Sequence, residues 1–210
     1  MSEVFRVLLA DDHPLVVRAL RALLEREHDF EVVGEVDDFR SLATALEKNR
    51  PDVLVVDVGM PGGDAVEMVR RARRDDKDLR VLVLSGFPEE DFIVRMIDAG
   101  AAGYARKDAD PAELLAAIRK VANGHMSISE AGALALAASA AGRGSEHEKL
   151  SDRELQVLRL LGRGSSVGDI AVELHLSPKT ISTYRVRMME KMGFTTTADI
   201  IRYAVRRGLV

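Results

Sequence analysis

Five short apolar runs alternate with five amphipathic helical patterns along the first 122 residues, and no other feature constrains the fold as strongly. The apolar runs have the length of strands and lie at 4–10, 30–36, 52–57, 80–85 and 102–105. The helical patterns lie near 14–26, 39–49, 64–74, 89–99 and 111–122. Strands that alternate with helices predict an α/β domain, in which helices cover both faces of a parallel sheet. Ligands bind such sheets at the carboxyl ends of the strands.

The chain changes character after residue 124. Residues 125–148 are rich in Ala, Gly and Ser, and they predict a short helix at 128–140 followed by a flexible GRGSEHE linker. From residue 149 onward the pattern is helical only, with helices to about 161 and at 167–174, 178–192 and 196–207. The sequence therefore predicts an α/β domain at 1–124, a linker at 125–148 and an all-α domain at 149–210.

Composition excludes several classes of protein. The chain has no cysteine, which rules out disulfides, Cys-based zinc sites and a thiol nucleophile. The N-terminus has no signal-peptide pattern, and no apolar run reaches the ~18 residues that a membrane span needs. We expect a cytoplasmic protein without a membrane partner.

Charge is distributed unevenly between the two predicted domains. Residues 1–124 hold 18 Lys and Arg against 25 Asp and Glu, whereas residues 149–210 hold 11 against 6. An acidic part joined to a basic part indicates that the basic part meets a polyanion such as nucleic acid. Ordinary scatter of charge is the simpler alternative, so this feature needs support from motifs.

Polar side chains follow the predicted strands at the points where ligands would bind. Asp11 and Asp12 end the first strand, Asp57 ends the third, Ser85 ends the fourth, and Lys107 follows the fifth. Carboxylates that lie close together repel one another and need a cation, and Mg²⁺ is the hard divalent ion that suits oxygen ligands. Together with a lysine and a hydroxyl, they form a site for phosphoryl transfer onto Asp57.

Each of these residues alone has a simpler explanation. An aspartate at a strand end is usually a turn residue or a helix cap. A serine after a strand is common in loops, and a lysine near a helix start is usually solvated. His13 is expected in a loop or capping role, since a lone histidine is weak evidence of catalysis. The whole set, with each member at a strand end, is much harder to explain by chance.

Residues 1–122 resemble a response-regulator receiver domain. The resemblance rests on LLADDHPLVVRAL, VVDVGMP, LVLSG and GAAGYARKDADPAELLAAI. It implies a flavodoxin-like (βα)5 fold and Asp57 as the phosphoacceptor. A sensor histidine kinase would supply the phosphoryl group. It further implies that Mg²⁺ is held by Asp12, Asp57 and the Gly59 carbonyl, with Asp11 acting through water. Contacts to the phosphoryl group and the conformational switch would fall to Ser85, Lys107 and Tyr104.

The basic domain shows the pattern of a helix-turn-helix. Two helices meet through the tight turn HLSPK, and the second would enter the major groove of DNA. We assign its inner stripe to Ile181, Val186, Met189 and Met192. Its outer face is expected to carry Lys179, Thr180, Ser182, Thr183, Arg185, Arg187 and Lys191. Short hydroxyl side chains let the helix approach base edges, while Lys and Arg reach phosphates. A plain helical bundle with a solvated basic face remains the alternative from spacing alone.

Residues 149–208 resemble the LuxR-type helix-turn-helix of NarL/FixJ regulators. The matching stretches are LSDRELQVLRLLGRG, IAVELHLSPKTISTYRVRMMEKMG and ADIIRYAVRRG. The resemblance implies double-stranded DNA binding by a homodimer, with RNA polymerase as a further candidate partner. Many members have lysine at position 182, where this chain has Ser182, so direct base readout is expected to be modest.

Together the two resemblances imply a two-component response regulator, in which phosphorylation of Asp57 controls dimerisation and transcription. One alternative is a regulator whose receiver works without phosphate, as a dimerisation module. Another is an aspartyl-nucleophile phosphatase, which usually needs a second acidic group just after the nucleophile. Position 59 is glycine, which disfavours the phosphatase. We therefore expect a regulator and not an enzyme.

Overall fold

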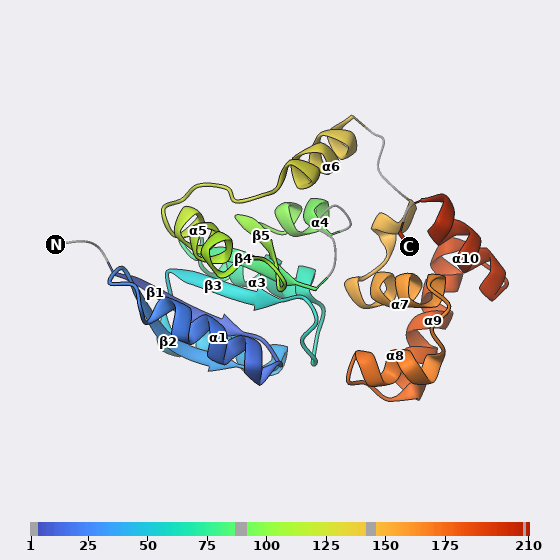
Figure 1. The fold of residues 1–210 in the computed structure, drawn as a ribbon, viewed down its shortest axis with the longest axis horizontal. Coiled ribbons are helices and arrows are strands. Elements are labelled where there is room, and N and C mark those ends of the chain that lie inside the picture. The colour runs from blue at the N-terminus through green and yellow to red at the C-terminus, as the bar shows by residue number, and fades with distance from the viewer. Residues whose placement is uncertain (1–3, 87–91, 142–145, 208) are drawn as a thin grey trace. The chain divides into compact units, whose positions relative to one another are not determined.

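Figure 1 shows the computed structural model, which describes residues 4–86, 92–141, 146–207 and 209–210. The chain forms two compact units, Met1–Arg143 and Gly144–Val210. The first unit combines a sheet with helices, and the described part of the second is helical. Among the described residues, no helix is both long enough and apolar enough to cross a membrane.

The first unit is built on one parallel sheet with the strand order β2-β1-β3-β4-β5. The strands are β1 (Phe5–Ala10), β2 (Phe30–Val36), β3 (Val53–Asp57), β4 (Arg80–Ser85) and β5 (Gly103–Arg106). The helices are α1 (Pro14–Leu24), α2 (Phe39–Asn49), α3 (Ala65–Asp75), α4 (Ile93–Asp98) and α5 (Pro111–Ala122). This is the predicted flavodoxin-like (βα)5 fold. The first residues of the predicted helix at 89–99 lie outside the described residues.

Helices cover both faces of the sheet, because the central strands are apolar on both sides. In β3 the alternate residues Val53 and Val55 belong to the core that contains α1 and α5. Leu54 and Val56 are also buried, and they lie on the opposite face because successive side chains of a strand point to opposite sides. Continuous apolar runs are typical of parallel strands for this reason. The only polar member of the β3 run is Asp57, at its carboxyl end.

Aspartate caps fix the beginnings of three helices in the first unit. Asp38, Asp64 and Asp110 each accept a hydrogen bond from a backbone N–H in the first turn of the following helix. Each cap contributes about 1 kcal/mol, because it satisfies an N–H that has no partner within the helix. The predicted start of α5 at Asp110 and Pro111 is confirmed.

The segment after α5 pairs with β5, one of the two outer strands of the sheet. Ser127 forms a parallel bridge with Gly103 of β5, and α6 (Glu130–Ala140) follows and contacts α4. The predicted flexible linker GRGSEHE covers 142–148, and its first four residues lie outside the described residues. Its last three begin the 3-10 helix Glu146–Lys149, where the sequence predicted a flexible segment. The side chain of His147 is buried with its Nδ1 3.0 Å from Tyr203 Oη, which explains the ordered turn.

Four helices form the described part of the second unit. They are α7 (Asp152–Gly162), α8 (Val167–Glu173), α9 (Pro178–Met192) and α10 (Thr197–Arg206). Capping boxes start α7, α8 and α10, and Gly193 ends α9 in the left-handed conformation with φ 68°. Glycine adopts this conformation without strain, so it is the usual residue just after a helix.

Candidate functional site

Lys107 joins two buried carboxylates at the carboxyl edge of the sheet. Its Nζ lies 2.9 Å from Asp57 Oδ2 and 2.8 Å from Asp11 Oδ2. Asp11 and Asp57 are each only 3% exposed, and the Lys107 side chain is 15% exposed. β1 and β3 are neighbours in the sheet, which brings the two aspartates together. The position of Lys107 follows from β5, since its backbone N–H donates to the Ser85 carbonyl at 2.8 Å.

Burial dominates the electrostatics of Asp57. It raises the pKa of this carboxyl above the ordinary value, because the charged form loses contact with water. The positive charge of Lys107 opposes this shift, whereas the negative charge of Asp11 adds to it. A hydrogen bond from the Gly59 backbone also favours the ionised form. Asp57 therefore needs cations around it to act as a nucleophile at neutral pH.

Gly59 passes close to the Asp57 carboxylate. A Cβ at position 59 would lie 2.9 Å from Asp57 Oδ2, so a side chain there would displace the carboxylate or the backbone. The second acidic group that a phosphatase would need at this position is therefore disfavoured by geometry as well as by sequence.

Ser85 and Tyr104 lie on β4 and β5, the strands that follow β3 in the sheet. Ser85 is fully buried at the end of β4, one residue beyond Leu84, which pairs with Asp57. Tyr104 is buried in β5 and pairs with Val83 of β4. Ser85 thus lies on the strand next to Asp57, and Tyr104 lies one strand further out, on β5.

His13 is a residue whose place in this cluster the sequence did not predict. It occupies the N-cap position of α1 as expected of a capping residue, but its side chain forms no cap hydrogen bond. Instead its Nδ1 lies 2.8 Å from Asp12 Oδ1 and 3.0 Å from Asp11 Oδ1. Lys107 Nζ lies 3.2 Å from the same nitrogen. The only feature of the sequence that could have predicted this contact is that His13 directly follows Asp12.

The donor set fits Mg²⁺. Ligand atoms of Asp11, Asp12, His13 and Asp57 all lie within 4.8 Å of one another. Three carboxyl groups share one lysine here, and their ionised forms would carry an excess of negative charge that a divalent cation would balance. Carboxylate oxygens are the ligands that Mg²⁺ prefers. A cavity of about 460 Å³ opens beside Asp11 and Asp12 and gives access from solvent.

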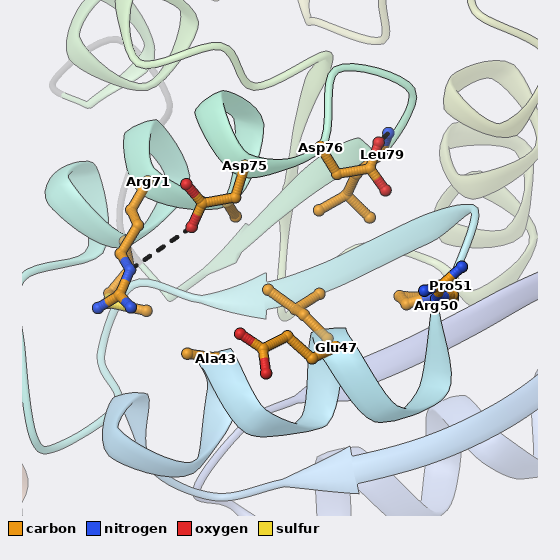
Figure 2. A pocket seen from close by; sticks show the side chains of 11 residues that line it. Ala43, Glu47, Arg50, Pro51, Arg71, Asp75, Asp76 and Leu79 are labelled. Atoms are coloured by element: carbon orange, nitrogen blue, oxygen red, sulfur yellow. Dashed lines mark hydrogen bonds and ion pairs between the residues drawn. The ribbon is translucent and has the colours of Figure 1, made fainter.

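A separate hollow of about 330 Å³ lies between α2 and α3 (Figure 2). Pro51 and Leu79 on its wall precede β3 and β4, so it lies at the amino edge of the sheet, opposite to Asp57. Arg71 and Asp75 form an ion pair of 3.6 Å at its rim (Figure 2). None of the predicted site residues lines it.

The helix-turn-helix consists of α8 and α9, joined at Ser177. The Ser177 side chain accepts a hydrogen bond from the Thr180 backbone, and Pro178 begins the helix, as predicted. Among the predicted DNA-contacting residues, the exposed ones are Lys179, Ser182, Thr183, Arg187 and Lys191, and the half-buried ones are Thr180 and Arg185.

Two of the basic residues that were predicted to contact DNA are bonded to other side chains of the second unit. Lys191 Nζ lies 2.6 Å from Glu154 Oε2 of α7. Arg185 donates to Thr197 Oγ1 of α10 at 3.0 Å. Both bonds connect α9 to a neighbouring helix. Lys179 and Arg187 are the two remaining basic residues of the predicted set, and both are exposed.

The predicted inner stripe of α9 is wrong at one position. Val186 is 54% exposed, whereas Met188 is fully buried with Ile181. Residues seven apart lie on the same face of a helix after two turns, but residues five apart do not. Met188 therefore continues the stripe from Ile181, and Val186 belongs to the outer face.

Comparisons with known proteins match each part of the chain to a protein family. The family described as "Response regulator receiver domain" matches residues 7–119. The family described as "Bacterial regulatory proteins, luxR family" matches residues 148–204.

Curated relatives match over nearly the whole chain. The response regulator UvrY of Escherichia coli (strain K12) is 35% identical, over 98% of this chain and 96% of its own length. The response regulator GacA of Pseudomonas aeruginosa is 35% identical, over 99% and 98%. The "virulence factors putative positive transcription regulator BvgA" of Bordetella pertussis is 38% identical, over 97% and 98%.

Solved structures of similar chains include RcsB from Salmonella enterica serovar Typhimurium bound to promoter rprA in the presence of the phosphomimetic BeF3⁻. That chain is 32% identical, with a TM-score of 0.61, and the match covers 96% of this chain and 98% of RcsB. Another structure, of two RcsB dimers bound to two parallel DNAs, is 29% identical, with a TM-score of 0.59 and coverage of 97% and 98%.

Proposed function

Because the chain belongs to the response regulators that carry a LuxR-type DNA-binding domain, we propose that phosphorylation of Asp57 controls its dimerisation and its binding to DNA. The observation that carries this proposal is the Lys107 bridge between Asp57 and Asp11, at 2.9 and 2.8 Å. It joins two buried carboxylates to one cation at one edge of the sheet, which supports the proposal.

The proposed chemistry is transfer of a phosphoryl group from a phosphohistidine of a sensor kinase. One Asp57 carboxylate oxygen forms a bond to phosphorus, while the bond from phosphorus to the histidine nitrogen breaks. The released imidazole takes up a proton from solvent. Asp12, Asp57 and the Gly59 carbonyl would hold Mg²⁺, with Asp11 acting through water. The ion, when bound, neutralises charge on the transferring oxygens.

The residues around Asp57 would then respond to the added group. Lys107 now pairs with an Asp57 oxygen, and it would pair with a phosphoryl oxygen instead. The Ser85 hydroxyl would donate to another phosphoryl oxygen. Tyr104 would follow Ser85, because β4 and β5 are hydrogen-bonded neighbours. The acyl phosphate adds charge and acceptor oxygens at one point, and repacking of β4 and β5 would carry that change outward.

We propose that α9 enters the major groove, with Lys179 and Arg187 on phosphates. Ser182 and Thr183, with Thr180 at the turn, would lie nearest to the bases. Arg185 and Lys191 would join them only by exchanging their bonds to Thr197 and Glu154 for phosphates. Two protomers would occupy half-sites roughly one helical turn apart.

The domain limits that we propose are 1–124 for the receiver, 125–148 for the linker and 149–210 for the DNA-binding domain. A regulator of this kind binds the chromosome, so we place it in the cytoplasm, with RNA polymerase as a further partner.

Phosphorylation would have to shift the protein from its inactive to its active state. A shift from 1:99 to 99:1 needs the phosphoryl group to stabilise the active state by about 5.5 kcal/mol more than the inactive state.

Intact-mass measurement after incubation with acetyl phosphate and Mg²⁺ tests the switch chemistry. We expect one added phosphoryl group, which is absent from Asp57→Asn and from a sample with EDTA. Asp64→Asn is the matched control, because it makes the same change at the cap of α3, where an amide still caps the helix. Addition to Asp57→Asn would contradict the assignment. If the wild type takes no phosphoryl group from acetyl phosphate or from a phosphohistidine donor, the phosphorylation switch is wrong.

A further inference from the structure

The outer face of α9 presents methyl groups at its centre. Val186 is 54% exposed there, although the sequence pattern assigned it to the core. Burial in the described unit does not explain an apolar side chain at this position, since the inner stripe is completed by Ile181 and Met188. Single exposed apolar residues are common on protein surfaces, so its neighbours on the helix decide what it can do.

The hydroxyl groups beside Val186 have already used their protons. Ser182 Oγ donates to the Pro178 carbonyl at 2.9 Å, and Thr183 Oγ1 donates to the Lys179 carbonyl at 3.0 Å. A hydroxyl has one proton, so neither can donate to a base without giving up its bond to the helix. At Thr183 the other branch of the side chain is a methyl group.

Thr183 and Val186 are three residues apart, so they are neighbours on the helix surface. Exposed basic residues lie on either side of them, Lys179 toward the start of the helix and Arg187 next to Val186. Glu190 is the following exposed position one turn beyond Val186, and its negative charge would be repelled by phosphate. The groove-facing stretch of α9 therefore runs from Lys179 to Arg187, and the methyl groups lie within it.

We propose that Val186 and Thr183 recognise the 5-methyl group of a thymine in each half-site. Thymine is the base that displays a methyl group in the major groove, and apolar side chains contact it there. Lys179 and Arg187 would fix the helix on the phosphates, which carry no sequence information directly. This inference rests on the proposed function, since it requires α9 to enter the groove. It adds Val186 as a residue that determines specificity.

Replacement of thymine by uracil tests the inference, because it removes the methyl group and keeps the base-pairing edge. The preferred duplex would first be selected from a random-sequence library with the phosphorylated full-length protein. Each thymine would then be replaced singly, and binding measured at fixed salt. We expect one position in each half-site at which uracil weakens binding about four-fold, the effect of one buried methyl group.

Val186→Ala should bind the selected duplex more weakly and should distinguish thymine from uracil at that position less than the wild type does, since only the Thr183 methyl group remains. Val172→Ala is the matched control, because Val172 is 77% exposed on α8, and this variant should keep the wild-type preference. Thermal unfolding would show that both variants remain folded. If uracil has no effect at any position, or if Val186→Ala keeps the full preference, the inference is wrong. If no sequence is enriched at all, sequence-specific DNA binding fails, and the inference fails with it.

Discussion

The acidic cluster in the first unit and the outer face of α9 in the second differ in how they hold their functional groups. Asp11 and Asp57 are buried and already paired with Lys107. Lys179 and Arg187 stand in solvent. Charges that are buried interact strongly, whereas exposed charges are screened by water and salt. Substitutions in the cluster should therefore change folding stability as well as chemistry, and those on α9 should mainly change binding.

The largest effect that we expect from this difference is at Lys107. Lys107→Met leaves two buried carboxylates without their cation, and we expect a loss of about 3 kcal/mol in the free energy of unfolding without Mg²⁺. Urea unfolding would measure it, and added Mg²⁺ should restore part of the loss. Lys120→Met, at an exposed position of α5, should change stability by less than about 0.5 kcal/mol. Equal effects of the two substitutions would contradict the difference that we expect between buried and exposed charges.

The second unit should be sensitive where its helices pack and tolerant on α8. A Cβ at Gly162 would lie 2.6 Å from Ala204 Cβ, so α7 and α10 would have to separate. Gly162→Ala should cost about 2 kcal/mol of stability. At Gly168 of α8 the nearest atom would be 3.6 Å away, and Gly168→Ala should stabilise the helix by about 0.5–1 kcal/mol. Thermal unfolding of both variants would show the opposite signs, and a shared sign would contradict the packing.

Asp57→Asn should stabilise the metal-free protein. Burial raises the pKa of Asp57, so the folded state holds its proton more tightly than the unfolded chain does. Stability contributed by this proton is present below the ordinary pKa of 3.8 and is lost as pH rises through the folded pKa. At pH 7 we expect Asp57→Asn to gain about 1 kcal/mol and to lose the stabilisation by Mg²⁺.

Urea unfolding at pH 7, with and without Mg²⁺, would measure both effects. Asp64→Asn should behave as the wild type in its response to Mg²⁺. A metal-free Asp57→Asn protein that is less stable than the wild type would show that Lys107 outweighs burial at this carboxyl.

The smallest effect on folding stability should come from Asp199. Its dependence on pH should be opposite to that of Asp57. Hydrogen bonds from the Thr196 side chain, and from the backbones of Thr196 and Thr195, lower the pKa of this half-buried carboxyl to about 2. Its stabilising effect on α10 is present above the ordinary pKa of 3.8 and is lost as pH falls toward the folded value. Asp199→Asn should remove this slope between pH 4 and about 2, as followed by helical circular dichroism. An unchanged slope would assign it to another carboxyl.

Sequence reasoning succeeded where chain order alone determines position. Parallel strands bring their carboxyl ends to one edge, so Asp11, Asp57 and Lys107 could be placed together without knowing any side-chain contact. It failed where position depends on three-dimensional packing. The Glu154–Lys191 ion pair joins residues far apart in the chain, and Val186 was assigned to the core because several apolar residues of α9 offered competing stripes. The contact of His13 with Asp12 likewise depends on side-chain direction, which no spacing rule supplies.

The hydrogen bonds of Ser127 have a consequence for the way such proteins are recombined. Ser127 donates to the Ala102 carbonyl at 3.0 Å and accepts from the Tyr104 N–H at 2.9 Å, and Gly103 between them leaves no room for a side chain. β5 is one of the two outer strands of the sheet, and an uncovered outer strand invites pairing with another chain. A chimera joined directly after α5 would leave this edge open to aggregation. The receiver becomes an exchangeable module only when the segment through Ser127 moves with it.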